Sequence, residues 1–490
     1  MPLDPRTPVL VGVAQVSQRF EDPLEGAEPL DMMVDAVRLA AEDARSPSLL
    51  ERADAVRVSR GRWRYGDPAR VVAERIGAPR AQSGITPWGG NTVQSLVNAT
   101  ALQIQAGERD VVVLAGAEHG YRQARAARSK IKLSYTAAPG EADWSLGPEK
   151  PMVHEAEIAR RIVSPVQFYP IFELALRHHL GESPADHAIR ISELWAGFAA
   201  VARDNPHAWI RDAPSAEVIR TPGEHNRMIG FPYPKLMNAN NAVDQGAALI
   251  LCSVEAARRA GVPEDRFVHL HAGTDADDPL FASNRRDLYA SPAMRIAGRR
   301  CLELAGCDVG EVAHFDVYSC FPSAVQIAAR EIGLPDDRPL SVTGGLTFGG
   351  GPLNNYVMHA IARMAELLRA DPGARGLVTG NGGYLAKHAF GLYSSEPAGR
   401  PFVHARPQEE VDAEPTREAV VDFEGPATLE SYTVMFDADG PTRAHAACLL
   451  EDGRRTWANS GEADLMASML AEEFCGRKVS LEGRGGLVVR

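Results

Sequence analysis

The sequence lacks any uncharged apolar run that approaches the roughly 20 residues of a membrane-spanning helix. Its first residues, MPLDPRTPVLVG, hold acidic and proline residues where a secretory leader would carry a basic and then an apolar segment. Cysteine is also scarce: the six cysteines among 490 residues form no CxxC pair, which favours neither a zinc site nor a disulfide framework. We therefore expect a cytoplasmic protein without a metal or another cofactor.

The chain has fewer basic than acidic residues. The chain has 52 lysines and arginines against 64 aspartates and glutamates, a net charge of −12. Such a field repels phosphate backbones, so the composition argues against nucleic acid as a partner. A basic run over residues 122–132 could meet one phosphorylated small molecule, but a solvated helical face is the more common cause of such a run. The length predicts two to four domains.

Two distant segments follow the same order of Gly-rich turn, helix, strand and second glycine turn. Helical spacing joins Leu96, Val97, Thr100, Ala101 and Ile104 in the first segment, and Val357, Ile361, Met364, Leu367 and Leu368 in the second. The apolar runs Val111–Leu114 and Gly376–Val378 are typical of buried strands. This repeat predicts two α/β halves, each a mostly parallel sheet with helices on its faces.

The regions around the two halves differ from them in composition and in hydrophobic pattern. Residues 121–238 are rich in charge and aromatic residues and mainly helical by period, which indicates an inserted loop domain. Short strand patterns at 419–423, 431–436, 445–450 and 486–489 predict a small all-β domain, and the proline-rich residues 401–415 are its expected linker. The predicted domains are therefore residues 1–120, 121–238, 239–400 and 417–490.

Four passages resemble the thiolase superfamily, in particular thiolase-like proteins related to the sterol-carrier-protein type. They are Gly89–Gly120, Asn240–Ile250, Phe315–Pro322 and Gly344–Leu353. The resemblance covers roughly residues 8–400 and implies a thiolase fold, α/β with two similar βαβαβ halves in five layers. With the small C-terminal barrel-like domain added, the sequence resembles the thiolase-like proteins of type 1. The resemblance also implies a role in lipid metabolism and an acyl-CoA or related acyl thioester as partner, and it leaves monomer and homodimer open.

Thiolases use a cysteine nucleophile at a helix N-terminus, an oxyanion-hole Asn or His, a His base and a second cysteine. The corresponding positions of this sequence hold Gly90, Tyr318, Gly351 and Thr379. Glycine cannot attack a thioester, so the resemblance implies that thiolysis and Claisen condensation are absent. Cys320 belongs to the motif of Tyr318, and the family does not use that cysteine as its nucleophile.

Two residues near the altered positions could still take part in catalysis. Tyr318 could serve as an acid or base if neighbours lowered its pKa, and His388 could shuttle a proton near the fourth catalytic loop. The alternatives are a tyrosine that fills the space of a missing side chain and a strand histidine that faces solvent. We predict a thiolase-like protein with a degenerate centre and an acyl-CoA-type cleft. The alternatives are a carbon–carbon lyase for a β-hydroxyacyl-CoA using Tyr318, and a scaffold role for the C-terminal domain.

Overall fold

A computed structural model describes residues 3–483 and 485–488. Ten strands lie in the order β10, β11, β12, β9, β1, β8, β4, β2, β3, β5, and β13 pairs with β9 beside this path. Their bounds are His314–Asp316 (β10), Arg375–Gly382 (β11), Lys387–Ser394 (β12), Val268–Asp277 (β9), Pro8–Ser17 (β1), Asp244–Ser253 (β8), Val111–His119 (β4), Ala55–Val58 (β2), Gln82–Ile85 (β3), Trp144–Ser145 (β5) and Val403–Ala405 (β13). The two halves meet where β1 and β9 share two residue pairs.

Helices separate and cover the two halves. Helices α3 (Thr92–Gln105) and α12 (Tyr356–Ala370) contact strands of both halves and form the central layer. Helices α1 (Pro29–Asp43) and α2 (Pro68–Arg75) cover the outer face of the first half, and α10 (Pro292–Ala305) covers that of the second, beside α11 (Pro322–Ile332). A short helix, α9 (Val254–Arg259), follows β8. The order of layers confirms the predicted five-layered α/β architecture.

The sequence repeat corresponds to the central helices and the strands after them. The predicted helical residues lie within α3 and α12, and nearly all of them are buried. Gly107 and Gly373 follow these helices with φ of +79° and +90°, a conformation that a residue without a Cβ adopts most easily. Every residue of β4 is buried, as expected for a strand covered on both faces.

Residues 121–238 are mainly helical, as predicted. Their helices are α4 (Gly120–Ser129, which starts one residue earlier), α5 (Glu155–Ala159), α6 (Pro165–Leu180), α7 (Pro184–Asp204) and α8 (Ala216–Arg220). Three short strands, β5, β6 (Met228–Gly230) and β7 (Tyr233–Pro234), were not expected. Runs of two or three residues carry no periodic signal, and their partners define them: β5 pairs with β3, and β6 pairs with β14 of the C-terminal domain.

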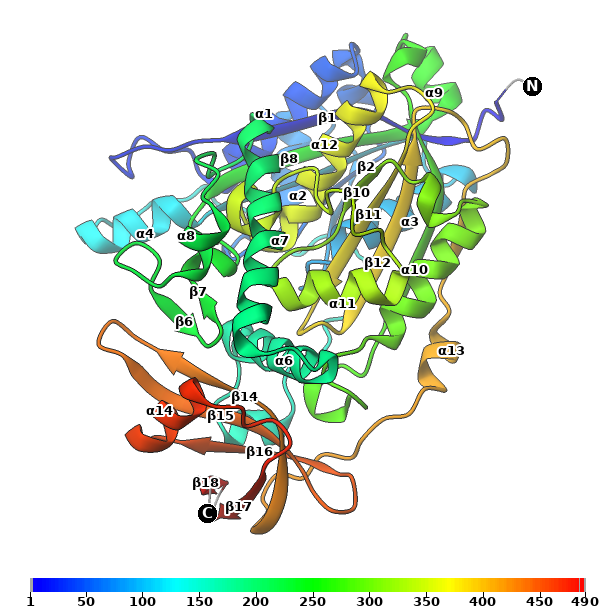
Figure 1. Ribbon diagram of the computed structural model, residues 1–490. Coiled ribbons are helices and arrows are strands. Elements are labelled where there is room, and N and C mark those ends of the chain that lie inside the picture. The colour runs from blue at the N-terminus through cyan, green and yellow to red at the C-terminus, as the bar shows by residue number, and fades with distance from the viewer. Residues whose placement is uncertain (1–2, 484, 489–490) are drawn as a thin grey trace.

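The C-terminal domain is a closed five-stranded barrel in the ring order β14, β15, β16, β18, β17. The strands are β14 (Gly425–Phe436), β15 (Pro441–Leu449), β16 (Arg455–Ser460), β17 (Lys478–Glu482) and β18 (Gly486–Val488), with α14 (Ala463–Ala471) after β16. The prediction of a small all-β domain is confirmed. Figure 1 shows the barrel in orange and red beside α6, at one end of the molecule.

One prediction around the barrel is wrong: residues 419–423 form no strand, because only Ala419 makes an isolated bridge, to Arg455. Residues 401–415, the expected linker, contain β13 and α13 (Gln408–Asp412), and β13 is fixed by its pairing with β9. Residues 1, 2, 484, 489 and 490, which belong to the predicted terminal domains, lie outside the described residues. The domain boundaries themselves stay a prediction.

The barrel is joined to the rest of the chain by buried polar contacts. The fully buried Arg455 guanidinium donates to both carboxylate oxygens of Glu430 at 2.6 Å and to the backbone carbonyl oxygens of Ala282 and Ser283 at 3.0 and 3.1 Å. Trp457 donates from Nε1 to Oγ of Ser283 at 2.8 Å. Within residues 3–483 and 485–488, no helix is both long and apolar enough to cross a bilayer.

Candidate functional site

The turn before α3 has no room for a side chain at position 90. A Cβ placed on Gly90 would lie 2.2 Å from the Tyr318 hydroxyl oxygen and 2.4 Å from the backbone carbonyl oxygen of Asn381. Both distances are far below van der Waals contact, so the position is closed by a side chain and by backbone. The structure therefore brings Gly90 and Tyr318 together, and the tyrosine occupies the space that a nucleophile side chain would need.

Tyr318 is held by residues of the second half of the fold. Its backbone N–H donates to Oγ1 of Thr379 at 2.9 Å, and its ring packs edge-on against Tyr356 with centroids 5.4 Å apart. Burial, with a further contribution from Cys320, raises the pKa of the Tyr318 phenol far above its usual value. The lowered pKa that would make Tyr318 a base is absent, and the phenol keeps its proton.

Cys320 lies in a closed aromatic environment. Tyr169 stacks on Phe321 with ring centroids 4.4 Å apart, and Asn381 donates from Nδ2 to the Tyr169 hydroxyl at 3.0 Å and to Cys320 Sγ at 3.8 Å. Burial raises the pKa of Cys320 to about 12, so the thiol stays protonated at neutral pH. A protonated thiol is a poor nucleophile, which removes the one cysteine of this motif as a replacement for the missing one.

Gly351 follows the glycine-rich turn Gly345–Gly349, which forms a single π-helical turn. Its N–H donates to the carbonyl oxygen of Asn240 at 3.0 Å, and a Cβ at Gly351 would lie 3.1 Å from that oxygen and from Oδ1 of Asn241. The surroundings of position 351 are therefore oxygen atoms, with no imidazole among these contacts to act as a base.

His388 is buried in β12 rather than exposed to solvent, so the expectation of a solvent-facing strand residue is wrong. Its Nε2 lies 3.3 Å from Oδ2 of Asp278 and 3.2 Å from the backbone carbonyl oxygen of Leu385. Across the β11–β12 pair it stands opposite Asn381, because these two strands are antiparallel neighbours in this register. Burial alone would raise the pKa of Asp278, but Arg285 and His388 hold it below its usual value.

A cavity of about 380 Å³ opens beside the N-terminus of α3. Its lining includes Asn91, which precedes α3, Thr92 of α3, Lys387 and His388 of β12, and Lys150, Asp275, Asp277, His404 and Arg406. Asp277 is paired with Lys150 and with Arg406, the latter at 2.6 Å, and Asp275 with His404 at 2.8 Å. Three lysine or arginine cations therefore stand against two carboxylates.

Lys387 is the cation in this cavity that makes no close ion pair among the described residues, although Asp277 and Glu149 act on it at longer range. Lys387 is only 6% exposed, and its Nζ donates to the backbone carbonyl oxygen of Trp88 at 2.6 Å. Nζ also lies 3.1 Å from where a Cβ of Gly89 would stand, so it reaches the turn before α3. Burial lowers the pKa of this ammonium group. Our sequence reasoning missed Lys387; the one signal was a lysine inside a strongly apolar strand.

One group of possible metal ligands also comes together outside this site. His178, Glu473 and Cys475 place one ligand atom each within 4.8 Å of one another. Glu473 is already paired with the buried Arg177 guanidinium, and burial raises the pKa of the Cys475 thiol. A neighbouring cation and a protonated thiol both disfavour a metal ion, so we assign none to this group.

Substitution of Gly90 by alanine tests the closed position. The new methyl group would meet the Asn381 carbonyl as well as Tyr318, so we expect Gly90→Ala to lose about 1–3 kcal/mol of stability, as overpacked interiors do. Gly310→Ala is the control, because a Cβ there meets no atom within 4 Å. Unfolding midpoints in urea measure both variants. Equal midpoints for Gly90→Ala and the wild type would show that position 90 is open.

Comparisons with known proteins agree with this arrangement. Residues 407–485 match a family model described as the thiolase-like protein type 1 additional C-terminal domain. A monomeric SCP2-thiolase-like protein type 1 from Mycobacterium smegmatis has 33% sequence identity and a TM-score of 0.85, and each chain is covered completely.

More distant relatives share parts of the chain or the fold alone. An acetyl-CoA acetyltransferase of Methanothermobacter thermautotrophicus is 24% identical over 216 residues, which are 39% of this chain and 54% of that protein, so the chain spans about half the length of this curated relative. An Ltp2–ChsH2(DUF35) aldolase has the same fold at a TM-score of 0.60 and 18% identity, over 80% of this chain and 99% of the other. From its full-length match the chain has a thiolase fold with an additional C-terminal barrel, and it belongs to the SCP2-thiolase-like proteins of type 1.

Proposed function

We propose that this protein has lost thiolase chemistry and binds an acyl-CoA or a related acyl thioester without condensing or cleaving it. Support for the loss comes from position 90, which the Tyr318 hydroxyl and the Asn381 carbonyl close. No thiolate replaces the missing nucleophile there, because the nearby Cys320 thiol stays protonated. The family's chemistry needs a thiolate and a base at these places, and neither group is available.

The observation that carries the binding proposal is the buried ammonium of Lys387, which makes no ion pair within 4 Å. An ammonium group removed from water costs free energy unless an anion compensates it. CoA carries several phosphate charges, and an acyl-CoA adds a thioester carbonyl, so a part of such a ligand placed in the 380 Å³ cavity would supply an anionic or acceptor partner for Lys387. Lys150 and Arg406 line the same cavity and add to its positive charge.

A second candidate is a carbon–carbon lyase that acts on a β-hydroxyacyl-CoA. The position of the Tyr318 hydroxyl, at the place of the family's nucleophile, favours it. Because its pKa is raised, the phenol would act as an acid. As the bond between the α and β carbons breaks, the β-hydroxyl group loses its proton and becomes the carbonyl of the released aldehyde or ketone. The phenol protonates the α carbon of the acyl-CoA fragment, and the proton from the hydroxyl group returns to the phenolate.

We also propose a cytoplasmic monomer. Six free, buried cysteines support a reducing compartment. Strand β5 takes the outer edge of β3 by pairing Trp144 with Gly84 and Ser145 with Ile85, so that edge is not offered to a second chain.

Loss of thiolase chemistry predicts that the purified protein does not cleave acetoacetyl-CoA in the presence of CoA above the rate in buffer. Gly90→Cys should not restore cleavage, because the Asn381 carbonyl and the absent base remain. The fall in absorbance of the magnesium enolate of acetoacetyl-CoA measures the rate. A steady, enzyme-dependent fall with the wild-type chain would refute the proposal.

Binding at Lys387 is measured by titration calorimetry with CoA and acetyl-CoA. We expect Lys387→Met to weaken the affinity for both about tenfold, the loss of one charge-assisted contact of about 1.4 kcal/mol. Lys478→Met, which removes an exposed lysine of the barrel, should bind like the wild type. No heat from wild type at millimolar ligand, or equal affinity of Lys387→Met, contradicts binding at this cavity.

The lyase candidate is tested by Tyr318→Phe, which keeps the ring and removes the proton. If the wild type splits a β-hydroxyacyl-CoA, the variant should lose about 100-fold or more of that turnover and keep its affinity for CoA. Tyr135→Phe, a tyrosine that is 43% exposed, is the control. Release of the aldehyde or ketone product is followed by chromatography. Unchanged turnover in Tyr318→Phe excludes this tyrosine as the acid.

A further inference from the structure

A larger cavity, of about 780 Å³, lies between α7, α11 and residues 334–341. None of the residues discussed above for the thiolase-like centre lines it. Its apolar wall is formed by Leu180, Leu194, Phe198, Val201, Val325 and Leu340. Cavities of about 300–1,000 Å³ with mainly apolar walls and a few placed polar groups are typical of small-molecule sites.

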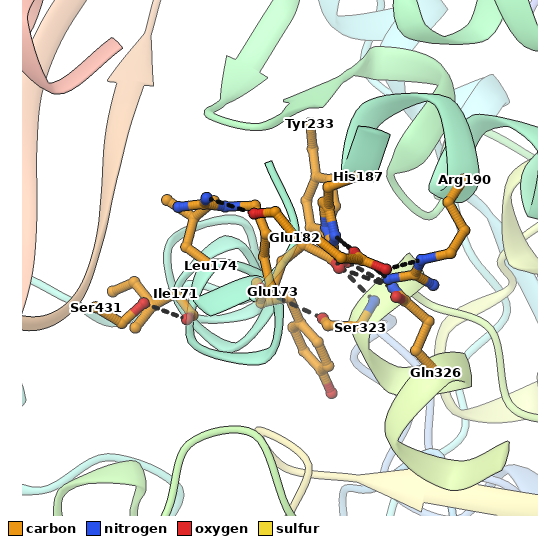
Figure 2. A network of polar contacts seen from close by, with 12 residues as sticks. Ile171, Glu173, Leu174, Glu182, His187, Arg190, Tyr233, Ser323, Gln326 and Ser431 are labelled. Atoms are coloured by element: carbon orange, nitrogen blue, oxygen red, sulfur yellow. Dashed lines mark hydrogen bonds and ion pairs between the residues drawn. The ribbon is translucent and has the colours of Figure 1, made fainter. Parts of the chain in front are cut away.

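A polar network lies against this cavity (Figure 2), since its members Glu182, Arg190 and Gln326 line the cavity. The fully buried Glu173 of α6 accepts a hydrogen bond from the Tyr233 hydroxyl, and Nε2 of Gln326 lies 2.8 and 3.0 Å from its two carboxylate oxygens. His187 stands between Glu173 and Glu182, with Nε2 2.8 Å from the first carboxylate and Nδ1 2.6 Å from the second. The network joins α6, α7 and α11 beside the cavity.

The two carboxylates of this network have close nitrogen neighbours. His187 places Nε2 2.8 Å from the Glu173 carboxylate and Nδ1 2.6 Å from the Glu182 carboxylate. The Arg190 guanidinium donates to both oxygens of Glu182 at 2.7 and 2.9 Å. Neither carboxylate therefore stands alone in this network.

Gln326 has a polar atom without a hydrogen-bond partner on the side away from Glu173. Its Nε2 must face Glu173, because only the NH₂ group can donate to a carboxylate, and this fixes the direction of the amide. The opposite atom, Oε1, is buried and has no hydrogen-bond partner, on a residue only 5% exposed that lines the cavity. An unpaired buried acceptor costs about 1–3 kcal/mol, which a ligand with a hydrogen-bond donor would recover.

The outer part of the cavity carries an excess of negative charge. Glu193, Asp336 and Asp337 line it together with Arg330 and Arg338, three acids against two cations. The Arg338 guanidinium is engaged with the backbone carbonyl oxygens of residues 310 and 312. A polyanion such as CoA is therefore disfavoured here, in contrast to the cavity at Lys387.

We propose that this cavity is a second binding site, for an uncharged and largely apolar molecule whose hydroxyl or amide N–H donates a hydrogen bond to Oε1 of Gln326. The apolar wall takes the body of the molecule, and the hydrogen bonds from Nε2 of Gln326 to Glu173 hold the acceptor in place. The acidic side chains of Glu193, Asp336 and Asp337 disfavour an anionic amphiphile. This inference does not rest on acyl-CoA binding, because the two cavities have different linings.

Three probes of equal chain length separate the contributions of the donor and of charge. In titration calorimetry with the full chain we expect 1-decanol to bind about tenfold more tightly than decyl methyl ether, which lacks the donor. Decanoate, which is anionic, should bind more weakly than decanol. Absence of decanol binding up to its solubility limit, or decanoate binding as tightly as decanol, overturns the proposal.

Two variants test where on the protein decanol binds. Ala329→Trp would fill part of the cavity and should abolish decanol binding, whereas Ala127→Trp, on the exposed face of α4, should leave it unchanged. Gln326→Met should bring the affinity for decanol down to that for the ether. Affinity for CoA should be unaffected by Ala329→Trp. Decanol binding that survives Ala329→Trp, or a preference over the ether that survives Gln326→Met, refutes this location.

Discussion

The approach of the Tyr318 phenol to the backbone of Gly90 is the contact on which the chemistry of this protein depends. Gly90 precedes α3 in the first half of the fold, whereas Tyr318 follows β10 in the second half. The Asn381 carbonyl of β11 closes the same space from another side. A site that is open in a thiolase is therefore a packed junction between the two halves here, and packing leaves no volume for a nucleophile.

The two cavities differ in the sign of their uncompensated charge. Lys387 places an ammonium that makes no close ion pair at the turn before α3, while the lining of the cavity between α7 and α11 has an excess of acidic side chains. Charges and acceptors removed from water interact strongly with whatever replaces the water. This difference underlies our two proposals, an anionic ligand for the first cavity and a neutral apolar ligand for the second.

Much of the fold could be predicted from local pattern. The residues at helical spacing in α3 and α12 are the residues that the two halves bury between them, and the glycines after both helices adopt the left-handed conformation. Prediction failed where pairing decides structure: residues 419–423 look like a strand but make one bridge, and β13 in the proline-rich segment exists because β9 lies beside it. Two or three residues carry too little pattern to show which neighbour they will meet.

The sequence by itself determined which chemical groups are missing, because glycine at positions 90 and 351 has no side chain in any fold. It did not determine which groups are left unpaired. Lys387 meets Trp88 across 299 residues, and Gln326 meets Glu173 across 153, so their burial and their partners exist only in the folded chain. Only the tertiary structure decided that the Lys387 ammonium makes no ion pair and that Oε1 of Gln326 has no hydrogen-bond partner, because desolvation and hydrogen bonding depend on surroundings that distant segments supply.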